Sequence, residues 1–201
     1  MTLTFRRATE DESDRLSDMV FGEPEQETQR VAARLFDVEN VELLRKLFRL
    51  IWREARNWET SEMALLDDAA AGVLQTGESS MRITPGVVLA AFRALGPLRT
   101  LRLPRRLRIR ARVTPEKPKG AYLVSELHVL PEFRGRGIGA AILEHGEADA
   151  RNRGLAVMAL TTLTTNPARR LYERFGFTAE CEATDAEFER ITGAAGNVLY
   201  V

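Results

Sequence analysis

A glycine-rich segment between a predicted strand and a predicted helix constrains this chain more than any other feature. The segment 134–139, with the sequence RGRGIG, follows the apolar stretch 121–130 and precedes a helix expected over about 137–152. The first amides of a helix lack partners within the helix and carry the positive end of its dipole. Glycine has no Cβ, so the backbone can approach an anion closely, and the two arginines add positive charge. The segment therefore predicts a pyrophosphate site, and a glycine turn without a ligand is the alternative from this segment alone.

Two other glycine-loop classes fit the segment less well. The dinucleotide-binding fingerprint needs the spacing GxGxxG near the start of a βαβ unit, whereas this chain has GxGxG late in its sequence. The phosphate loop of NTPases needs a Gly-Lys-Ser/Thr sequence, which the segment lacks. We therefore set both classes aside.

Composition indicates a soluble globular protein. The 201 residues, 44% of them hydrophobic and 29% charged, predict one domain over 1–201 with a sizeable core. The 29 basic and 29 acidic residues cancel, so we expect no nucleic-acid partner and no membrane surface. No apolar run reaches the ~18 residues of a membrane span, and the N-terminus lacks the apolar run of a signal peptide. The single cysteine, Cys181, cannot form an intrachain disulfide, so we expect a cytoplasmic protein.

Periodicity and breaker residues predict alternating strands and helices. Strands are expected at 3–8, 63–66, 71–74, 121–130, 155–163, 177–181 and 197–201. Helices are expected at 9–21, within 24–58, from Thr84-Pro85 to about Leu95, at 137–152 and at 166–174. A longer link joins the last two strands. The run 106–113 alternates strictly, which favours a strand, whereas the helix propensity of arginine favours a helix.

Positive charge is concentrated in residues 99–119. The stretch contains one acidic residue, Glu116, and these basic residues: Arg99, Arg102, Arg105, Arg106, Arg108, Arg110, Arg112, Lys117 and Lys119. A solvated face is the ordinary interpretation of such a run. The alternative is an anion site, for a substrate or for phosphates.

A second motif follows the strand expected at 155–163. Residues 165–177 have the sequence TNPARRLYERFGF. Asn166 or Thr165 is a good helix N-cap there, and Pro167 fits the first turn. A lone tyrosine such as Tyr172 is more often a core residue than a catalytic one, so its interpretation depends on the whole pattern.

Together the two motifs resemble the GNAT superfamily of CoA-dependent N-acetyltransferases. The RxxGxG element of that family is matched by Arg134, Gly137 and Gly139. The LYxxxGF element is matched by Leu171, Tyr172, Gly176 and Phe177. The resemblance covers about 121–177, and the first strand, the first helix and the hairpin are compatible with it.

The resemblance implies an α/β (α+β) fold with a mixed, V-shaped sheet of about seven strands flanked by helices. Acyl-CoA is expected to enter where two central parallel strands part, here the strand ending at Leu130 and the one beginning at Leu155. The CoA-binding core is expected at about 121–177. Helical insertions that shape the acceptor pocket are expected before the hairpin, over 22–60, and between the third and fourth strands, over 77–118. The second insertion is the reason to favour a helix for the alternating arginine run.

The resemblance also implies which residues bind acetyl-CoA, the co-substrate, and it implies no metal. These residues are Leu127, Val129, Arg134, Gly135, Arg136, Gly137, Ile138, Gly139, Ala140, Thr165 and Asn166. One departure affects the last two. The family usually has its CoA-contacting Asn seven residues before the Tyr, where this chain has Thr165, and Asn166 is one residue closer. Either residue is therefore a candidate for the contact.

Acetyl transfer to an amine needs a base, an oxyanion donor and an acid, because an ammonium group cannot attack and a leaving thiolate must be protonated. The resemblance puts the oxyanion donor at the Val129 N–H and the acid at Tyr172. Alternation along the strand puts Glu126 and His128 on one face. Glu126 is the expected base, directly or through water, and His128 is the alternative. His145, on the helix after the loop, is expected to be structural.

The expected function is N-acetyl transfer from acetyl-CoA to a primary amine by direct attack in a ternary complex. A small-molecule amine, a protein N-terminus and a lysine side chain are all open as acceptors. A non-catalytic acyl-CoA-binding or sensor domain is the alternative from another class. The presence of Arg134, the glycines, Glu126 and Tyr172 argues against it. A homodimer is also left open.

Overall fold

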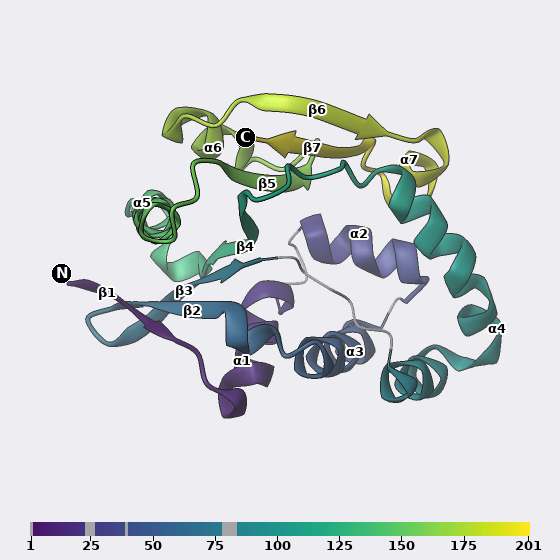
Figure 1. Cartoon of the computed structure of the whole chain (residues 1–201). Helices are drawn as coiled ribbons and strands as arrows, with labels where there is room; N and C mark the ends of the chain where they lie inside the picture. The colour runs from purple at the N-terminus through teal and green to yellow at the C-terminus, as the bar shows by residue number, and fades with distance from the viewer. Residues whose placement is uncertain (1, 23–26, 39, 78–83) are drawn as a thin grey trace.

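The computed structural model describes residues 2–22, 27–38, 40–77 and 84–201. Its strands are β1 (Leu3–Arg7), β2 (Ser61–Leu66), β3 (Ala69–Thr76), β4 (Tyr122–Val129), β5 (Met158–Leu163), β6 (Ala179–Thr184) and β7 (Gly196–Tyr200) (Figure 1). Its helices are α1 (Ser13–Phe21), α2 (Glu27–Phe36), α3 (Val41–Glu54), α4 (Pro85–Arg112), α5 (Ile138–Asn152), α6 (Arg169–Phe175) and α7 (Ala186–Thr192). Short 3-10 helices precede α1, β2 and the glycine loop: η1 (Glu10–Glu12), η2 (Asn57–Thr60) and η3 (Pro131–Phe133).

The strands form one mixed sheet in the order β1-β2-β3-β4-β5-β7-β6. Neighbouring strands are antiparallel except β4 and β5, which are parallel. These two strands pair only from Tyr122–Met158 to Val124–Leu160. Beyond that point they diverge, so the sheet opens into a V between its two halves (Figure 1). The architecture confirms the predicted mixed sheet with two central parallel strands that part.

An irregularity in β4 decides which side chains face the opening. The neighbouring residues Thr76 and Gln75 of β3 pair with Val124 and Glu126, so Ser125 is an extra residue in β4. Side chains of a regular strand alternate between the two faces. The extra residue therefore turns Glu126 to the face opposite that of Val124.

The consequence is visible in the packing on either side of this bulge. Before it, the Tyr122 hydroxyl donates a hydrogen bond to a carboxylate of α5 at 2.9 Å. Beyond it, Leu127 and Val129 pack against the core cluster that α5 shares with the sheet. Glu126 and His128 alternate with them and face the other side. The bulge thus keeps apolar side chains toward α5 and turns the two titratable groups away from it.

Helices cover both faces of the sheet (Figure 1). α5 and α6 pack on one face, where Ile142 is fully buried. α1 and α3 pack on the other face against β2 and β3, with Trp52 in that cluster. α2 lies in the opening of the V, where its Val31 and Leu35 pack with Leu163 of β5. No helix formed by the described residues combines the length and apolarity that crossing a membrane requires.

The structure of α4 shows whether the alternating run 106–113 is a strand or a helix. Gly96 has φ 73° and ψ 171°, which interrupts the helix where Gly96-Pro97 predicts its end. A second helical half then continues to Arg112. The alternating run 106–113 is therefore helical almost throughout, which confirms the helix rather than the strand.

The C-terminal part differs from expectation in several details, among them β6, which spans Ala179–Thr184 rather than 177–181. The link between the last two strands contains α7, whose start is capped by the Asp185 carboxylate accepting the Phe188 N–H at 2.9 Å. α6 begins at Arg169 rather than at 166, because the Asn166 side chain accepts the Ala168 N–H at 2.9 Å and forms a turn first. β5 begins at residue 158 rather than 155.

Candidate active site

A cleft opens where β4 and β5 part. It encloses a cavity of about 360 Å³, lined by residues of α1, α2, α3, the end of α4, β4, β5, α6, α7 and β7. Four of the predicted site residues with polar side chains line it: Glu126, His128, Asn166 and Tyr172. The structure thus brings the predicted base, its alternative and the predicted acid to one cavity.

Glu126 is the one acidic residue among the described residues that line this cleft. Loss of hydration raises its pKa to about 7, and the positive charges of Arg110 and Lys117 act in the opposite direction. A carboxyl group with a pKa near neutrality is partly ionised at neutral pH and can take up a proton there. Its surroundings therefore suit general-base chemistry.

Tyr172 reaches the same cleft from α6, with 6% of its surface exposed. Its ring packs edge-on against Phe177 and at a tilt against Tyr200. Burial raises the pKa of the phenol to about 12, and the negative charge of Glu126 acts in the same direction. The hydroxyl has no hydrogen-bond partner in the described part of the chain. It therefore stays protonated at neutral pH and is available as a proton donor.

The two histidines have different surroundings. His128 is buried, with 5% of its surface exposed, and it lines the cleft on the same face of β4 as Glu126. His145 of α5 forms a hydrogen bond with Glu62 and stacks on Phe5, with 3.9 Å between the ring centroids. His128 thus lines the cleft beside Glu126, and its role as the alternative base stays a prediction. His145 lies outside the cleft and contributes to packing.

The glycine loop exposes its backbone at the start of α5. Gly135 and Gly137 have φ values of +74° and +79°, a region that residues with a Cβ rarely adopt. Gly137 is the N-cap of α5, and the first hydrogen bond of the helix joins the Ala141 N–H to the Gly137 carbonyl at 3.1 Å. The three amides of residues 138–140 therefore have no partner within the helix.

The side chains around the loop complete a cradle for an anion. A Cβ on Gly139 would lie 2.9 Å from Leu171 Cδ2 of α6, so the backbone passes close to that helix. The Arg134 Nε donates to the Val129 carbonyl at 2.9 Å, and the Arg136 guanidinium lies over an aromatic ring of η3 at 5.7 Å. Free amides, glycine conformations and two guanidinium groups form a donor set that fits a pyrophosphate.

The Val129 amide points into the opening between the strands. The Leu130 N–H donates to the Ala71 carbonyl of β3 at 2.9 Å. Because successive amides of a strand point to opposite sides, the Val129 N–H points away from β3 and toward β5. The β4–β5 ladder ends at Val124–Leu160, so within the described sheet this amide has no strand partner. It is a backbone donor at the edge of the cleft.

Of the two candidate contacts before α6, Asn166 lines the cleft and Thr165 does not. The Asn166 Nδ2 donates to the Thr162 Oγ1 at 2.7 Å, and its Oδ1 accepts from the Ala168 N–H. Both ends of the amide are thus engaged locally, whereas the Thr165 side chain is exposed. The contribution of either residue to ligand binding stays a prediction.

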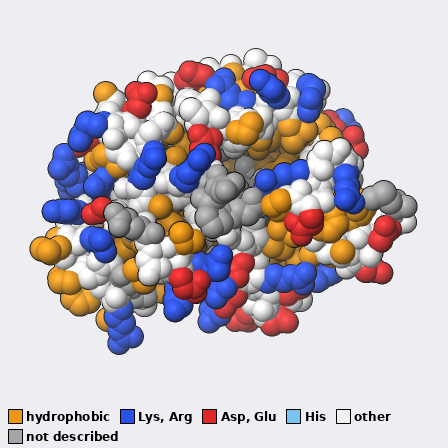
Figure 2. Space-filling model, turned by 180° about the vertical axis from the view of Figure 1, so that it is seen from behind, with side chains coloured by type: hydrophobic (Ala, Val, Ile, Leu, Met, Phe, Trp, Pro, Cys, Tyr) orange, Lys and Arg blue, Asp and Glu red, His pale blue; other side chains and the backbone are white. Residues whose placement is uncertain are grey.

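Some basic side chains of the stretch 99–119 lie at the surface, and others line the cleft. Four of its arginines form ion pairs with Asp37, Asp185 or Glu187: Arg99, Arg102, Arg105 and Arg112. Seen from behind, basic side chains gather on the side of the molecule that α4 covers (Figure 2). Arg110 and Lys117 instead line the cleft. The excess of charge in the sequence indicated this stretch, but not which of its members reach the site.

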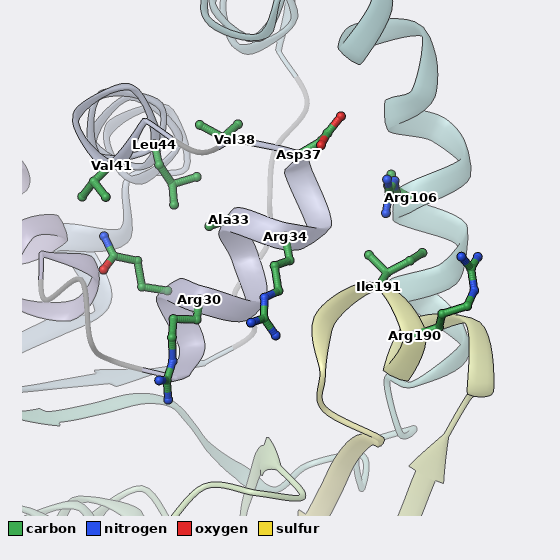
Figure 3. A pocket seen from close by; sticks show the side chains of 11 residues that line it. Arg30, Ala33, Arg34, Asp37, Val38, Val41, Leu44, Arg106, Arg190 and Ile191 are labelled. Carbon is green, nitrogen blue, oxygen red and sulfur yellow. The ribbon is translucent and has the colours of Figure 1, made fainter.

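A second hollow lies on the other side of α2 (Figure 3). It has a volume of about 570 Å³ and is bordered by α2, α3, α4 and α7. Its charged lining is Arg30, Arg34, Asp37, Arg106 and Arg190. Although this hollow is larger, none of the predicted site residues lines it. The cleft between β4 and β5 is therefore the candidate active site.

Comparison of the sequence with models of known protein families finds a match. A model of the acetyltransferase (GNAT) family matches residues 41–177. The streptothricin acetyltransferase of Streptomyces lavendulae is 32% identical over 79 residues, which make up 39% of this chain and 41% of that protein. The match thus spans less than half of either protein.

Solved structures share the fold over the whole chain. An N-acetyltransferase from Staphylococcus aureus Mu50 has a TM-score of 0.60 and 12% identity, with 98% of each chain covered. The PaiA N-acetyltransferase of Thermoplasma acidophilum, in complex with coenzyme A, has a TM-score of 0.57 and 11% identity, with 100% of this chain and 98% of that chain covered. At these identities the likeness concerns the fold.

The raised pKa of Glu126 makes the stability of the fold depend on pH. The group ionises near pH 4.5 when unfolded and near pH 7 when folded, so a penalty for the folded state grows between these values and is complete above them. Glu126→Gln should therefore raise the free energy of unfolding at pH 8, by at most about 3 kcal/mol, and change it little at pH 4.5. Urea denaturation at the two pH values measures the difference.

The matched control is Glu132→Gln, which changes an exposed carboxyl on η3. Its effect on the free energy of unfolding should be small at both pH values. Equal effects of Glu126→Gln at pH 4.5 and pH 8 would show that Glu126 ionises alike in the folded and unfolded states.

Proposed function

The chain belongs to the acetyltransferase (GNAT) family, and on that premise we propose that it moves an acetyl group from acetyl-CoA to the primary amine of a small molecule. The observation that carries the proposal is the convergence of Glu126 and Tyr172 on one cleft between the parted strands. One is a carboxyl group with a pKa of about 7 and the other a phenol with a pKa of about 12. These different environments support opposite tasks for the two groups at the same pH, base for Glu126 and acid for Tyr172.

We assign the glycine loop to the pyrophosphate of acetyl-CoA. The amides of residues 138–140 and the guanidinium groups of Arg134 and Arg136 are the donors for it. Leu127 and Val129 belong to the strand that leads from this loop to the cleft. When bound, acetyl-CoA supplies an activated acetyl thioester, and the residues of the chain hold it and move protons.

The proton movements follow from the chemistry of an amine. The acceptor arrives mostly as an ammonium ion, so Glu126 first takes one proton from its nitrogen. The Val129 N–H donates to the carbonyl oxygen that gains negative charge. As the nitrogen–carbon bond forms and the carbon–sulfur bond breaks, the Tyr172 hydroxyl protonates the sulfur and regains a proton from the nitrogen. Glu126 releases its proton to water, so the products are an amide, CoA and one proton.

The size of the cleft supports a small acceptor. A cavity of about 360 Å³ falls in the range of small-molecule sites, roughly 300–1,000 Å³. Residues of α2 and α7 line it together with those of the sheet. A helix covering the open end of the V leaves less room for a folded protein surface than for a small amine.

The function is tested by incubating the protein with acetyl-CoA and a panel of amines and measuring free thiol. We expect thiol release that requires an amine. Tyr172→Phe removes one hydroxyl, so it should lower kcat about 10²-fold while the affinity for acetyl-CoA changes little. Acetyl-CoA binding without amine-dependent thiol release would identify a non-catalytic binding domain. Full activity of Tyr172→Phe would leave Tyr172 a packing residue.

The pH dependence of the rate distinguishes Glu126 from His128 as the base. Glu126→Gln should lose most activity below the pKa of the acceptor and recover partly above it, where free amine is abundant. His128→Gln should keep most activity throughout. The reverse pattern, with His128→Gln inactive and Glu126→Gln normal across pH, would assign the base to His128.

A further inference from the structure

Arg110 and Lys117 bring positive charge into the cleft itself. Together with Glu126 they are the charged residues among the described residues that line it. The charge of Arg110 interacts with that of Glu126, yet the two side chains form no ion pair within 4.0 Å. In the described part of the chain, neither cation has a carboxylate partner.

The backbone that carries Arg110 is held in place. Its neighbours Ile109 and Val113 are buried, with 1% and 0% of their surfaces exposed. The Asn197 Nδ2 of β7 donates to the Val113 carbonyl at 2.7 Å, and the Thr114 Oγ1 donates to the Arg110 carbonyl at 2.9 Å. The base of the Arg110 side chain is therefore fixed at the cleft before any ligand arrives, which reduces the entropy lost on binding.

The Arg110 guanidinium is in surroundings that favour an anionic partner. Arg110 is exposed and lines the open cleft, yet the protein around its guanidinium displaces enough water to lower the pKa of Arg110. A partly dehydrated cation is normally neutralised by an anion. Glu126 does not fill this role in the proposed mechanism, because its carboxylate receives the ammonium group of the acceptor. The described lining thus has two cations and one anion, and that anion is engaged elsewhere.

The phosphates of acetyl-CoA do not supply the missing anion in this arrangement. None of the loop residues 134–140 that we assign to the pyrophosphate lines the cleft. Arg110 and Lys117 instead share the cleft with α2 and α7 and with the face of β4 that carries Glu126. The anion to be expected beside them therefore belongs to the second substrate.

We infer that Arg110, together with Lys117, forms an anion-binding subsite of the acceptor pocket, and that the acceptor is an amine that also carries a carboxylate or phosphate group. This inference rests on the proposed function. The ammonium end of such a molecule lies at Glu126 and its anionic end at Arg110, whose planar fork can bind two oxygens at once. The same two cations disfavour amines with several positive charges and no anion.

Matched acceptors test the inference. Initial rates are measured at saturating acetyl-CoA with ω-amino carboxylates of increasing chain length, the corresponding ω-amino carboxamides and ω-aminoalkyl phosphates. The wild-type kcat/KM for the best anionic acceptor should exceed that for its neutral counterpart about 10-fold or more. The carboxylate and phosphate series show which anion is preferred. Arg110→Met should reduce the ratio to near one, mainly through the KM of the anionic acceptor.

Two further variants separate charge recognition from general effects. Arg110→Lys should keep part of the preference, because it keeps the charge. Arg108→Met removes an exposed arginine of the same helix that does not line the cleft, and it should leave the ratio unchanged. The ratio is the readout because removing the Arg110 charge also affects the ionisation of Glu126, which acts on both acceptors alike.

Equal kcat/KM values for the anionic and neutral acceptors, or an unchanged ratio in Arg110→Met, would overturn the inference, while amine-dependent thiol release would leave the proposed function standing. A preference for succinyl-CoA over acetyl-CoA that is lost in Arg110→Met would place the subsite on the donor side and overturn the inference as well. Absence of thiol release with every amine would contradict the proposed function and the subsite together.

Discussion

The parting of β4 and β5 beyond Val124–Leu160 is the constraint on which the rest of the structure depends. In a continuous sheet, the amides of both strands would be hydrogen-bonded between the strands, and the side chains would pack against covering helices. Here the ladder ends after three residue pairs, so the Val129 amide is left at an open edge and a cavity forms between the two halves. Unpaired buried backbone donors are costly, which makes this edge a place where a ligand gains from binding.

The bulge at Ser125 determines what faces that opening. Without it, regular alternation would put Glu126 on the same side as Tyr122, toward α5. The extra residue reverses the alternation, so Glu126 and His128 face the cleft while Leu127 and Val129 still pack toward α5. Because of this one inserted residue, one side of β4 faces α5 and the glycine loop, and the other side carries Glu126 and His128.

Burial in the cleft shifts the pKa values of the two groups that we propose as base and acid. Partial loss of water raises the pKa of Glu126 toward neutrality and that of Tyr172 far above it. Arg110 and Lys117 oppose this rise in the pKa of Glu126, which favours the ionised form of the carboxyl. In this account the two cations have a double effect, because they tune the base and also attract an anionic acceptor.

The sequence predicted the parts of the site that are local along the chain. The segments 134–139 and 165–177 have fixed internal spacing, so their strand, loop and helix contexts followed from glycine conformation, capping and apolar pattern. The bulge and the position of Arg110 beside Glu126 depend on contacts between distant segments, which periodicity does not encode. The turn that delays α6 is local, but it is made by the Asn166 side chain and so leaves no mark on the apolar pattern. Helix α7 was missed because its seven residues are too short to show helical periodicity, although Asp185 is an ordinary capping signal.

The most direct test of this account is the behaviour of the Val129 amide in protein labelled with ¹⁵N-valine. We expect its amide hydrogen to exchange quickly in the free protein and its resonance to shift strongly when acetyl-CoA is added, because the parted strands leave it free to bind the thioester oxygen. The Val198 amide, within the strand ladder formed by β5, β7 and β6, serves as the internal reference and should change little. A Val129 amide that is already protected, and that does not respond while acetyl-CoA binds, would contradict the claim that the strand opening forms the site of acetyl transfer.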